Sequence, residues 1–293
     1  MHITWLPPEA APPAAPFFEA LRSGRGRAHG FLEPLPADED AWRRALDQIA
    51  GEASRPSLAL ARQLAARQGV LGTGREAEAG ALALAEPTTL AVVTGQQPGL
   101  LGGPLMSFHK IAGAIALARR LDAIHSGRVV PVFWLASEDH DLAEANQLLL
   151  LDGQGQPRRL SLPQGPDGRS LMHVDVPHAD TDRLLGEVAE LLPDTDRGRA
   201  ALDLLTRAPD EDFATWCLRC LVRLIGPDAG LVVVEPPRLL PHAGDAFATL
   251  VREGHRFRDA VARTGDRLRE AELPAPLQPP AGELPVFLRG EVT

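Results

Sequence analysis

The fold is decided by the stretch at residues 90–104, which reads LAVVTGQQPGLLGGP. Residues 90–94 form a short apolar run, the pattern typical of a buried strand. The next ten residues hold four glycines and two prolines, which excludes regular structure there. Residues 105–121 follow as a helical pattern, with Ile111, Ile115 and Leu121 on one side. This stretch therefore predicts a strand, a glycine loop and a helix in succession.

Two further apolar runs of strand length lie downstream, VVPVFWLA at residues 129–136 and LVVV at residues 231–234. Neither run alternates with polar residues, which is typical of parallel strands that are buried on both faces. Connections between such strands are right-handed in nearly all proteins. We therefore predict an α/β fold with a doubly wound, mostly parallel sheet.

The other segments follow ordinary amphipathic or strand patterns. An N-terminal arm and helical segment, residues 1–88, is expected to pack on an α/β core formed by residues 89–293. Within the first part, residues 1–16 are rich in Pro and Ala and predict an extended arm. Helices are expected at 38–50, 57–68, 181–192, 198–206, 211–225 and 244–269, a hairpin at 147–152 with 158–162, and a strand at 286–289.

The bulk composition excludes several classes of protein. The net charge is −9 and no dense arginine cluster occurs, so a nucleic-acid partner is not expected. No apolar stretch approaches the length of about 20 residues that a membrane span needs. The N-terminus lacks the pattern of a signal peptide, so we expect a cytoplasmic protein without a membrane partner. Cys217 and Cys220 lie inside an apolar helical pattern, which favours core residues over a redox or zinc site.

Glycines and amides follow the first predicted strand, at the end of the strand where open parallel sheets bind ligands. Glycines allow positive φ and a close approach of backbone N–H groups to a ligand. The N-terminus of the next helix favours a phosphate or a carboxylate. The loop matches neither GxGxxG nor a Walker A motif, so a purely structural turn stays open. The binding residues predicted here are Gly95, Gln96, Gln97 and Gly99.

The chain's only lysine stands beside a histidine in the helix that follows this loop, as His109-Lys110. Of the 30 lysines and arginines one is Lys, and Asn146 is the single asparagine. Because the codons of Lys and Asn are rich in A and T, this indicates a GC-rich genome in which Arg replaces most lysines. A lysine that remains is therefore informative. Lys pairs with phosphate as a point charge, and His donates to phosphate or carries a proton. We predict that both are catalytic, with a structural histidine as the alternative.

Four ionisable residues follow the second predicted strand, Glu138-Asp139-His140-Asp141. Charge at a buried strand end is costly without a ligand. The carboxylates could hold an ammonium group or a ribose hydroxyl and could tune His140 as a general base. We predict that His140 and Asp141 are catalytic, and that Glu138, Asp139 and Asn146 bind substrate or nucleotide, without a metal ion. A solvated helix cap and a metal site at residues 139–141 are the alternatives.

Glu235 follows the third predicted strand and is a further candidate for the same cleft. The two prolines after it favour a plain turn.

These motifs together resemble a known family, the bacillithiol biosynthesis cysteine-adding enzymes (BshC). The resemblance rests on order and spacing over about fifty residues, and weaker similarity extends over most of the chain. Residues 230–236 also resemble a later strand of the family, which usually ends in Asp-Pro and here ends in Glu235-Pro236. The matching strings are TGQQPGL at 94–100, GP at 103–104, HK at 109–110 and PVFWLASEDHD at 131–141.

The resemblance implies a Rossmann-like core with an N-terminal helical prelude, and an enzyme that adds L-cysteine to the amine of glucosaminyl-malate by forming an amide bond. It implies that the motif residues line the site. Lys110 and the loop would hold a phosphate or carboxylate, residues 138–141 the substrate amines, and His140 or His109 would take the proton. ATP or another nucleotide stays open as a cofactor, and a homodimer as the oligomeric state.

Members of this family continue into a coiled coil and a C-terminal section. No long heptad run occurs in this sequence, so we expect both to be absent from it. Two readings compete with the ligase. The first is a truncated or inactive Rossmann-like module that binds a nucleotide or anion, and the second is a metal-dependent hydrolase that uses Asp139, His140 and Asp141.

Overall fold

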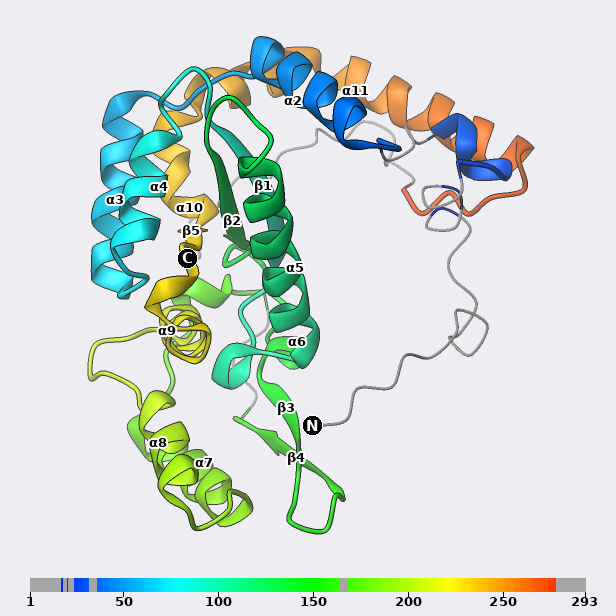
Figure 1. Cartoon of the computed structure of the whole chain (residues 1–293). Coiled ribbons are helices and arrows are strands. Elements are labelled where there is room, and N and C mark those ends of the chain that lie inside the picture. Colours follow the sequence, from blue (N-terminus) through cyan, green and yellow to red (C-terminus); the bar gives the residue numbers. More distant parts are fainter. Residues whose placement is uncertain (1–16, 18–19, 21–23, 32–35, 164–167, 278–293) are drawn as a thin grey trace. The chain divides into compact units, whose positions relative to one another are not determined.

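The computed structural model of the chain describes residues 17, 20, 24–31, 36–163 and 168–277 (Figure 1). The chain divides into two compact units, one formed by Arg43–His242 and one that combines Met1–Trp42 with Ala243–Thr293. The arm expected at 1–16 and the strand expected at 286–289 lie outside the described residues.

Among the described residues, the larger unit is built on a parallel sheet of three strands in the order β1-β2-β5. These strands are β1 (Leu90–Gln96), β2 (Val129–Leu135) and β5 (Val232–Val234). β1 pairs with β2 over its whole length, and β2 pairs with β5 over three residues. The predicted parallel sheet is confirmed, with each strand formed by one of the apolar runs.

Helices cover both faces of this sheet. On one face, valines of β2 and β5 pack on α3 (Leu58–Leu71) and α4 (Arg75–Ala83). On the other face, Phe133, Leu135 and Val233 pack on α5 (Leu105–Asp122) and α9 (Phe213–Ile225). Alternate residues of β2 and β5 thus enter different apolar cores, which is why these two runs are apolar throughout, whereas Ala91 and Val93 of β1 are exposed. The doubly wound α/β class is confirmed.

The remaining described elements agree with the predicted patterns to within a few residues, apart from α4 and the short helices α6 and α10, which the sequence patterns did not predict. The domain boundary expected at residue 88 stays a prediction, although α3 and α4 of that segment pack on the sheet. The other α-helices and strands are α2 (Glu39–Glu52), α6 (Leu142–Ala145), the β3 (Gln147–Leu151) and β4 (Pro157–Ser161) hairpin, α7 (His178–Leu191), α8 (Asp196–Leu204), α10 (Pro236–Leu239) and α11 (Gly244–Glu270).

The smaller unit has its own apolar cluster, which includes Ala28 and Leu273. Phe17 and Phe31 meet edge to face with their ring centroids 6.4 Å apart. The guanidinium of Arg267 lies 5.0 Å from the centre of the Phe31 ring, within the range of a cation–π contact.

The two cysteines lie among the buried residues of α9, as the apolar pattern predicted. Both are free and buried. Burial raises the pKa of Cys217 well above its ordinary value and raises that of Cys220 to about 12. Thiols of this kind stay protonated at neutral pH and are poor nucleophiles, which supports the structural reading.

The outer edge of β5 is closed by one side chain, Gln68 of α3. Its Nε2 donates to the backbone oxygen of Val233 at 2.8 Å, and its Oε1 accepts from the Val233 N–H at 2.9 Å. Gln68 is fully buried, and Thr73 donates to the same amide oxygen at 3.1 Å. The amide therefore satisfies the peptide groups that a neighbouring strand would otherwise take.

Replacing this amide by a hydrocarbon is predicted to destabilise the larger unit. Gln68→Leu leaves the N–H and C=O of Val233 buried without partners, which costs about 1–3 kcal/mol. Urea unfolding followed by circular dichroism measures the change. Gln63→Leu, at an exposed position of the same helix, is the control and is expected to stay within about 0.5 kcal/mol of the wild type. Equal stability of the two variants would show that the edge needs no amide.

Candidate active site

The two sequence motifs meet where β1 and β2 end. The register pairs Gln96, the last residue of β1, with Leu135, the last residue of β2. The pairing continues one step further, because the Ala136 N–H donates to the Gln96 oxygen at 3.0 Å. The glycine loop and the acidic run therefore leave the sheet side by side, at its carboxyl end.

A chain of side-chain hydrogen bonds joins the two motifs. Lys110 donates from Nζ to Oε1 of Gln96 at 2.7 Å. The Gln96 amide donates to Oε1 of Gln97 at 3.0 Å, and the Gln97 amide donates to Oδ2 of Asp139 at 2.9 Å. A cation and a carboxylate that are 29 positions apart in the sequence are thus connected through two neighbouring glutamines. Four of the predicted site residues take part in this series of hydrogen bonds, namely Lys110, Gln96, Gln97 and Asp139.

Close packing explains two of the loop glycines. A Cβ on Gly95 would lie 2.9 Å from the Trp134 oxygen, and one on Gly99 would lie 2.6 Å from the Cα of Gly103. Neither residue has a positive φ, contrary to the backbone role expected for the loop glycines in general. That role falls to Gly102 and Gly103, with φ of 99° and 85°. Gly95 and Gly99 keep the loop tight against its neighbours.

The backbone of the acidic run is anchored by a segment further along the chain. The Ser137 oxygen accepts from the Ser170 hydroxyl at 2.8 Å and from the Met172 N–H at 3.2 Å. The Asp139 oxygen accepts from the Leu171 N–H at 2.7 Å. These three bonds hold the turn after β2 in one place, so its side chains are positioned by a fixed backbone.

Adjacent carboxyl groups in this run experience opposite pKa shifts. For Asp139, burial opposes ionisation, but hydrogen bonds from Gln97 and from the N–H groups of Asp141 and His140, together with the His140 charge, lower the pKa. For Glu138, burial raises the pKa, a backbone hydrogen bond opposes this, and the charge of Asp139 adds to the rise. The run therefore contains one readily ionised carboxylate and one that holds its proton to higher pH, a division of roles found in acid–base sites.

The other predicted residues are placed as follows. His140 is exposed, with Nδ1 3.7 Å from Oδ1 of Asp139. Asp141 caps α6 by accepting from the Glu144 N–H at 2.9 Å, so the helix-cap reading holds for this residue. His109 is exposed on α5, beside Lys110. Asn146 is buried and donates to the Leu162 oxygen at 3.2 Å, which commits its amide to the β3–β4 hairpin.

Glu235, the candidate after the third strand, is bound to arginines. Its carboxylate accepts from Arg67 at 2.6 Å and 2.9 Å and from Arg238 at 2.9 Å. The favoured turn is a short helix, α10, that begins directly after it. Glu235 therefore joins α3 to the end of β5.

A pocket of about 230 Å³ opens between the glycine loop and the start of the hairpin. Its lining includes residues that the sequence patterns did not single out, namely Pro104, Glu144 and Gln147. Glu144 lies three positions after Asp141, one helical turn away, and that spacing is the signal that could have found it. The lining residues are Gln96, Gln97, Pro98, Gly99, Pro104, Asp141, Glu144, Ala145 and Gln147.

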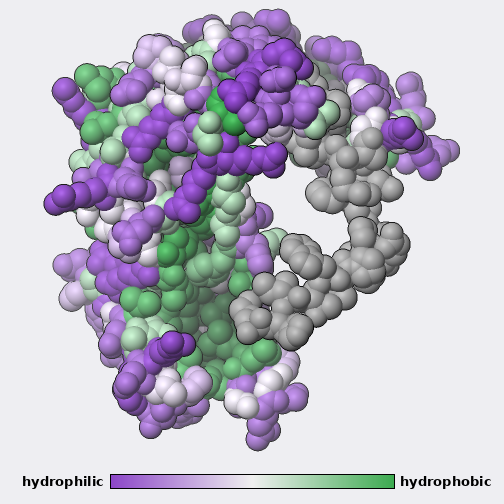
Figure 2. All heavy atoms as spheres, in the orientation of Figure 1, coloured by the Kyte–Doolittle hydropathy of each residue, from purple (hydrophilic) through white to green (hydrophobic). Residues whose placement is uncertain are grey.

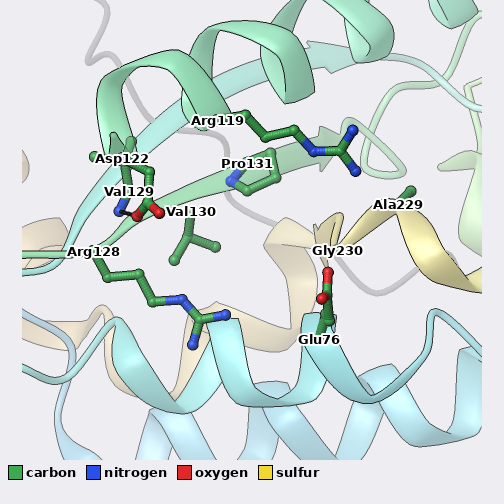
Figure 3. Close-up of a pocket in the computed structure, with 9 residues that line it drawn as sticks. All are labelled: Glu76, Arg119, Asp122, Arg128, Val129, Val130, Pro131, Ala229 and Gly230. Atoms are coloured by element: carbon green, nitrogen blue, oxygen red, sulfur yellow. Dashed lines mark hydrogen bonds between the residues drawn. The ribbon is translucent and has the colours of Figure 1, made fainter. Parts of the chain in front are cut away.

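A second pocket, of about 200 Å³, lies at the opposite end of the sheet, around the first residues of β2. Figure 3 shows Arg119 reaching over it from α5 and Glu76 facing it from α4. Ligands of open parallel sheets bind at the carboxyl ends of the strands, whereas this hollow surrounds an amino end. The pocket at the glycine loop is therefore the better candidate for the active site.

Within the described part of the chain, no group of three His, Cys, Asp or Glu side chains is arranged to hold a metal ion. Asp139 instead directs its carboxylate oxygens to Gln97 and to two backbone N–H groups. The geometry of these residues gives no support to the metal-dependent hydrolase. No helix in the described residues is long and apolar enough to cross a membrane.

The family model for Bacillithiol biosynthesis BshC, N-terminal Rossmann-like domain, matches residues 1–291. The chain belongs to this family. The predicted resemblance and the Rossmann-like fold are thereby confirmed.

Curated relatives in the BshC family are considerably longer than the present chain. A protein of Desulforamulus reducens is 32% identical over 228 residues, which cover 77% of this chain and 41% of the relative. A protein of Geobacillus sp. is 31% identical over 246 residues, covering 82% of this chain and 45% of the relative. Both bear the name "Putative cysteine ligase BshC". The chain thus spans less than half the length of these two relatives.

The hydrogen bond from Gln97 is predicted to lower the pKa of Asp139. Gln97→Ala removes this donor, so the pKa is expected to rise, as measured by carbon NMR of the carboxyl groups during an acid titration. Because the folded pKa lies below the unfolded one, the stability from Asp139 is present above the unfolded pKa and lost as the pH falls through the folded value. The variant should therefore lose less stability in acid.

Asp152 provides the internal control for this titration. Its pKa is also lowered, first by the N–H groups of Gln156 and Gln154, and these bonds are far from Gln97 in the sequence. Its titration should be the same in both proteins. An unchanged pKa of Asp139 in the variant would contradict the connection between the two motifs.

Proposed function

We propose that this chain forms the catalytic Rossmann-like part of a cysteine ligase of bacillithiol biosynthesis, which joins L-cysteine to the amine of glucosaminyl-malate through an amide bond. Membership of the BshC family and the names of the relatives support the proposal. The observation that carries it is the hydrogen-bonded chain from Lys110 to Asp139 beside the pocket at the glycine loop.

The charges of the two motifs suit the two substrates. L-cysteine carries both an ammonium and a carboxylate, and glucosaminyl-malate carries an amine and the malate carboxylates. In the proposed complex, Lys110 and the loop backbone hold a carboxylate or a phosphate. Glu138 and Asp139 hold the amines, because a carboxylate accepts charge-assisted hydrogen bonds from an ammonium group.

The reaction forms a C–N bond between the glucosamine nitrogen and the carboxyl carbon of cysteine, while the bond from that carbon to its leaving group breaks. The attacking nitrogen loses a proton, which His140 or His109 is proposed to accept. Nδ1 of His140 lies 3.7 Å from Oδ1 of Asp139. Asp141 completes the proposed catalytic set at the rim of the pocket. The residues thus contribute orientation and electrostatic stabilisation rather than covalent catalysis.

A carboxylate does not react with an amine without activation, and ATP or another nucleotide is the proposed source. Lys110 and the helix N-terminus behind the glycine loop are groups that fit a phosphate. We further propose that the protein is cytoplasmic, acts on small molecules and forms a homodimer. The alternative is a module that binds the anion without catalysis, for which the exposed position of Lys110 would suffice.

Lys110 is predicted to be needed for the reaction. Lys110→Ala removes the cation that would hold the anionic group, and the expected fall in kcat/KM is about 100-fold. Product is measured by mass spectrometry after incubation with L-cysteine and glucosaminyl-malate, with and without ATP. Arg119→Ala, a loss of another exposed cation from the same helix, is the control and should leave the rate unchanged.

Binding and turnover are separated by a second measurement. Saturation-transfer NMR reports whether glucosaminyl-malate contacts the chain, whatever the rate of the reaction. Binding that is lost in Lys110→Ala, without product from the wild type, would favour the binding module. Wild-type rates in Lys110→Ala would exclude the assigned role of this lysine.

A further inference from the structure

The hollow of about 200 Å³ at the amino end of the sheet is lined by charged side chains that lack a partner in the protein. Arg119, Arg128 and Glu76 line it, and none of the three forms a hydrogen bond or an ion pair with another described residue. Asp122 differs, because its Oδ1 accepts from the Val129 N–H at 2.8 Å. Charges of both signs that surround one hollow without pairing leave room between them for a ligand.

Three elements hold the unpaired side chains around the start of β2. Arg119 lies in the last turn of α5, Arg128 directly precedes β2, and Glu76 lies in the first turn of α4. In Figure 3 both arginine side chains extend toward the side of the hollow where Glu76 and Gly230 lie. All these residues belong to the larger unit, so the hollow is formed within a single compact body. Figure 2 shows that charged and polar residues dominate the surface over the upper part of the molecule, so the chemistry has to be identified from the lining itself.

Close backbone packing fixes the wall that carries Glu76. Gly74, the residue before α4, has a φ of 90°, and a Cβ on it would lie 2.2 Å from the Pro227 oxygen. The start of α4 is thereby held against the turn at 227–229. Gly230 follows this turn with a φ of 67°, and a Cβ on it would lie 3.2 Å from Oε2 of Glu76. The glycine leaves space for the carboxylate at the rim, so this wall is positioned before any ligand arrives.

The size and charge of the hollow define the class of ligand. Pockets for drug-sized molecules hold about 300–1,000 Å³, so this volume suits a smaller molecule. Two guanidinium groups suit a carboxylate, and a carboxylate suits an ammonium group. The lining holds two basic and two acidic side chains, so its formal charge is zero, which favours a zwitterion over a phosphate. The apolar part of the lining is small and consists of Val129, Val130, Pro131 and Ala229.

We propose that this hollow binds a free amino acid with a small side chain. Arg119 and Arg128 hold its carboxylate, and Glu76 holds its ammonium group. The site lies at the opposite end of the sheet from the glycine loop, and binding there is no step of the proposed reaction. The inference therefore goes beyond the proposed function and holds whether or not the chain is a ligase.

The test is a titration of the full chain with L-alanine, followed by proton–nitrogen NMR. Shifts are expected at the backbone amides of Val129 and Gly230 and at the side-chain Nε–H of Arg128. Propionate and ethylamine are the matched probes, because each keeps one of the two charged groups of alanine. Each should bind at least about 10-fold more weakly than L-alanine, since hydrogen bonds between charged groups are among the strong ones.

Two variants separate the proposed roles of the charges. Arg128→Gln should weaken the binding of both L-alanine and propionate at least about 10-fold. Glu76→Gln should weaken L-alanine to a similar extent but should not weaken propionate, which has no ammonium group. Arg120→Gln is the control, since Arg120 is exposed on α5 next to Arg119 but lies outside the lining, and it should bind L-alanine normally. Circular dichroism verifies the fold of all three variants.

Four results would overturn the proposal. They are the absence of shifts with L-alanine, binding that survives both Arg128→Gln and Glu76→Gln, and shifts at Gln96 and Gln97 in place of those at Val129 and Gly230. The fourth is tighter binding of inorganic phosphate than of L-alanine at the same amides, which would assign the hollow to anions.

Discussion

Seven consecutive residue pairs join β1 to β2, and the candidate site depends on their register. Parallel pairing makes both strands end at the same level, so the loop after Gln96 and the run after Leu135 begin as neighbours. A slip of one residue would move every side chain of β1 to the opposite face. It would also separate Gln97 from Asp139, since a single hydrogen bond of 2.9 Å connects them. Apolar residues of β2 that are buried in the two cores, such as Val132 and Phe133, hold the partner strand of this register in place.

Much of this arrangement follows from the sequence because it depends on long apolar runs and on glycine and proline positions. The runs at 129–136 and 231–234 specify buried strands, and the helices between the runs have clear amphipathic faces. The run at 90–94 also forms a strand, but Ala91 and Val93 are exposed, so the expected burial of this strand was wrong. α4 was not predicted because it is built largely from Ala and Glu, and its buried face consists of small residues such as Ala77 and Ala81. Side chains of that size give a weak periodic signal.

The site was predicted at the level of its location and less well at the level of individual roles. Strand ends can be inferred from the sequence, whereas the direction of a side chain depends on its partners in three dimensions. Asn146 illustrates this, since its rarity drew attention but its amide holds the hairpin. Gly95 and Gly99 were assigned to ligand approach, yet tertiary contacts with Trp134 and Gly103 are what exclude a Cβ. Lys110 meets Gln96 only because α5 packs back along β1.

The contrast between the two sheet edges connects fold and function. A buried glutamine is an expensive way to close an edge, because its amide must find partners for all its polar atoms. Gln68 finds them in Leu64, Thr73 and Val233. Within the described residues, the outer edge of β1 has no partner strand, and Val93 and Trp134 beside it are 59% and 38% exposed. The strand that positions Gln96 and Gln97 at the pocket is thus also the strand whose outer edge has no partner strand among the described residues.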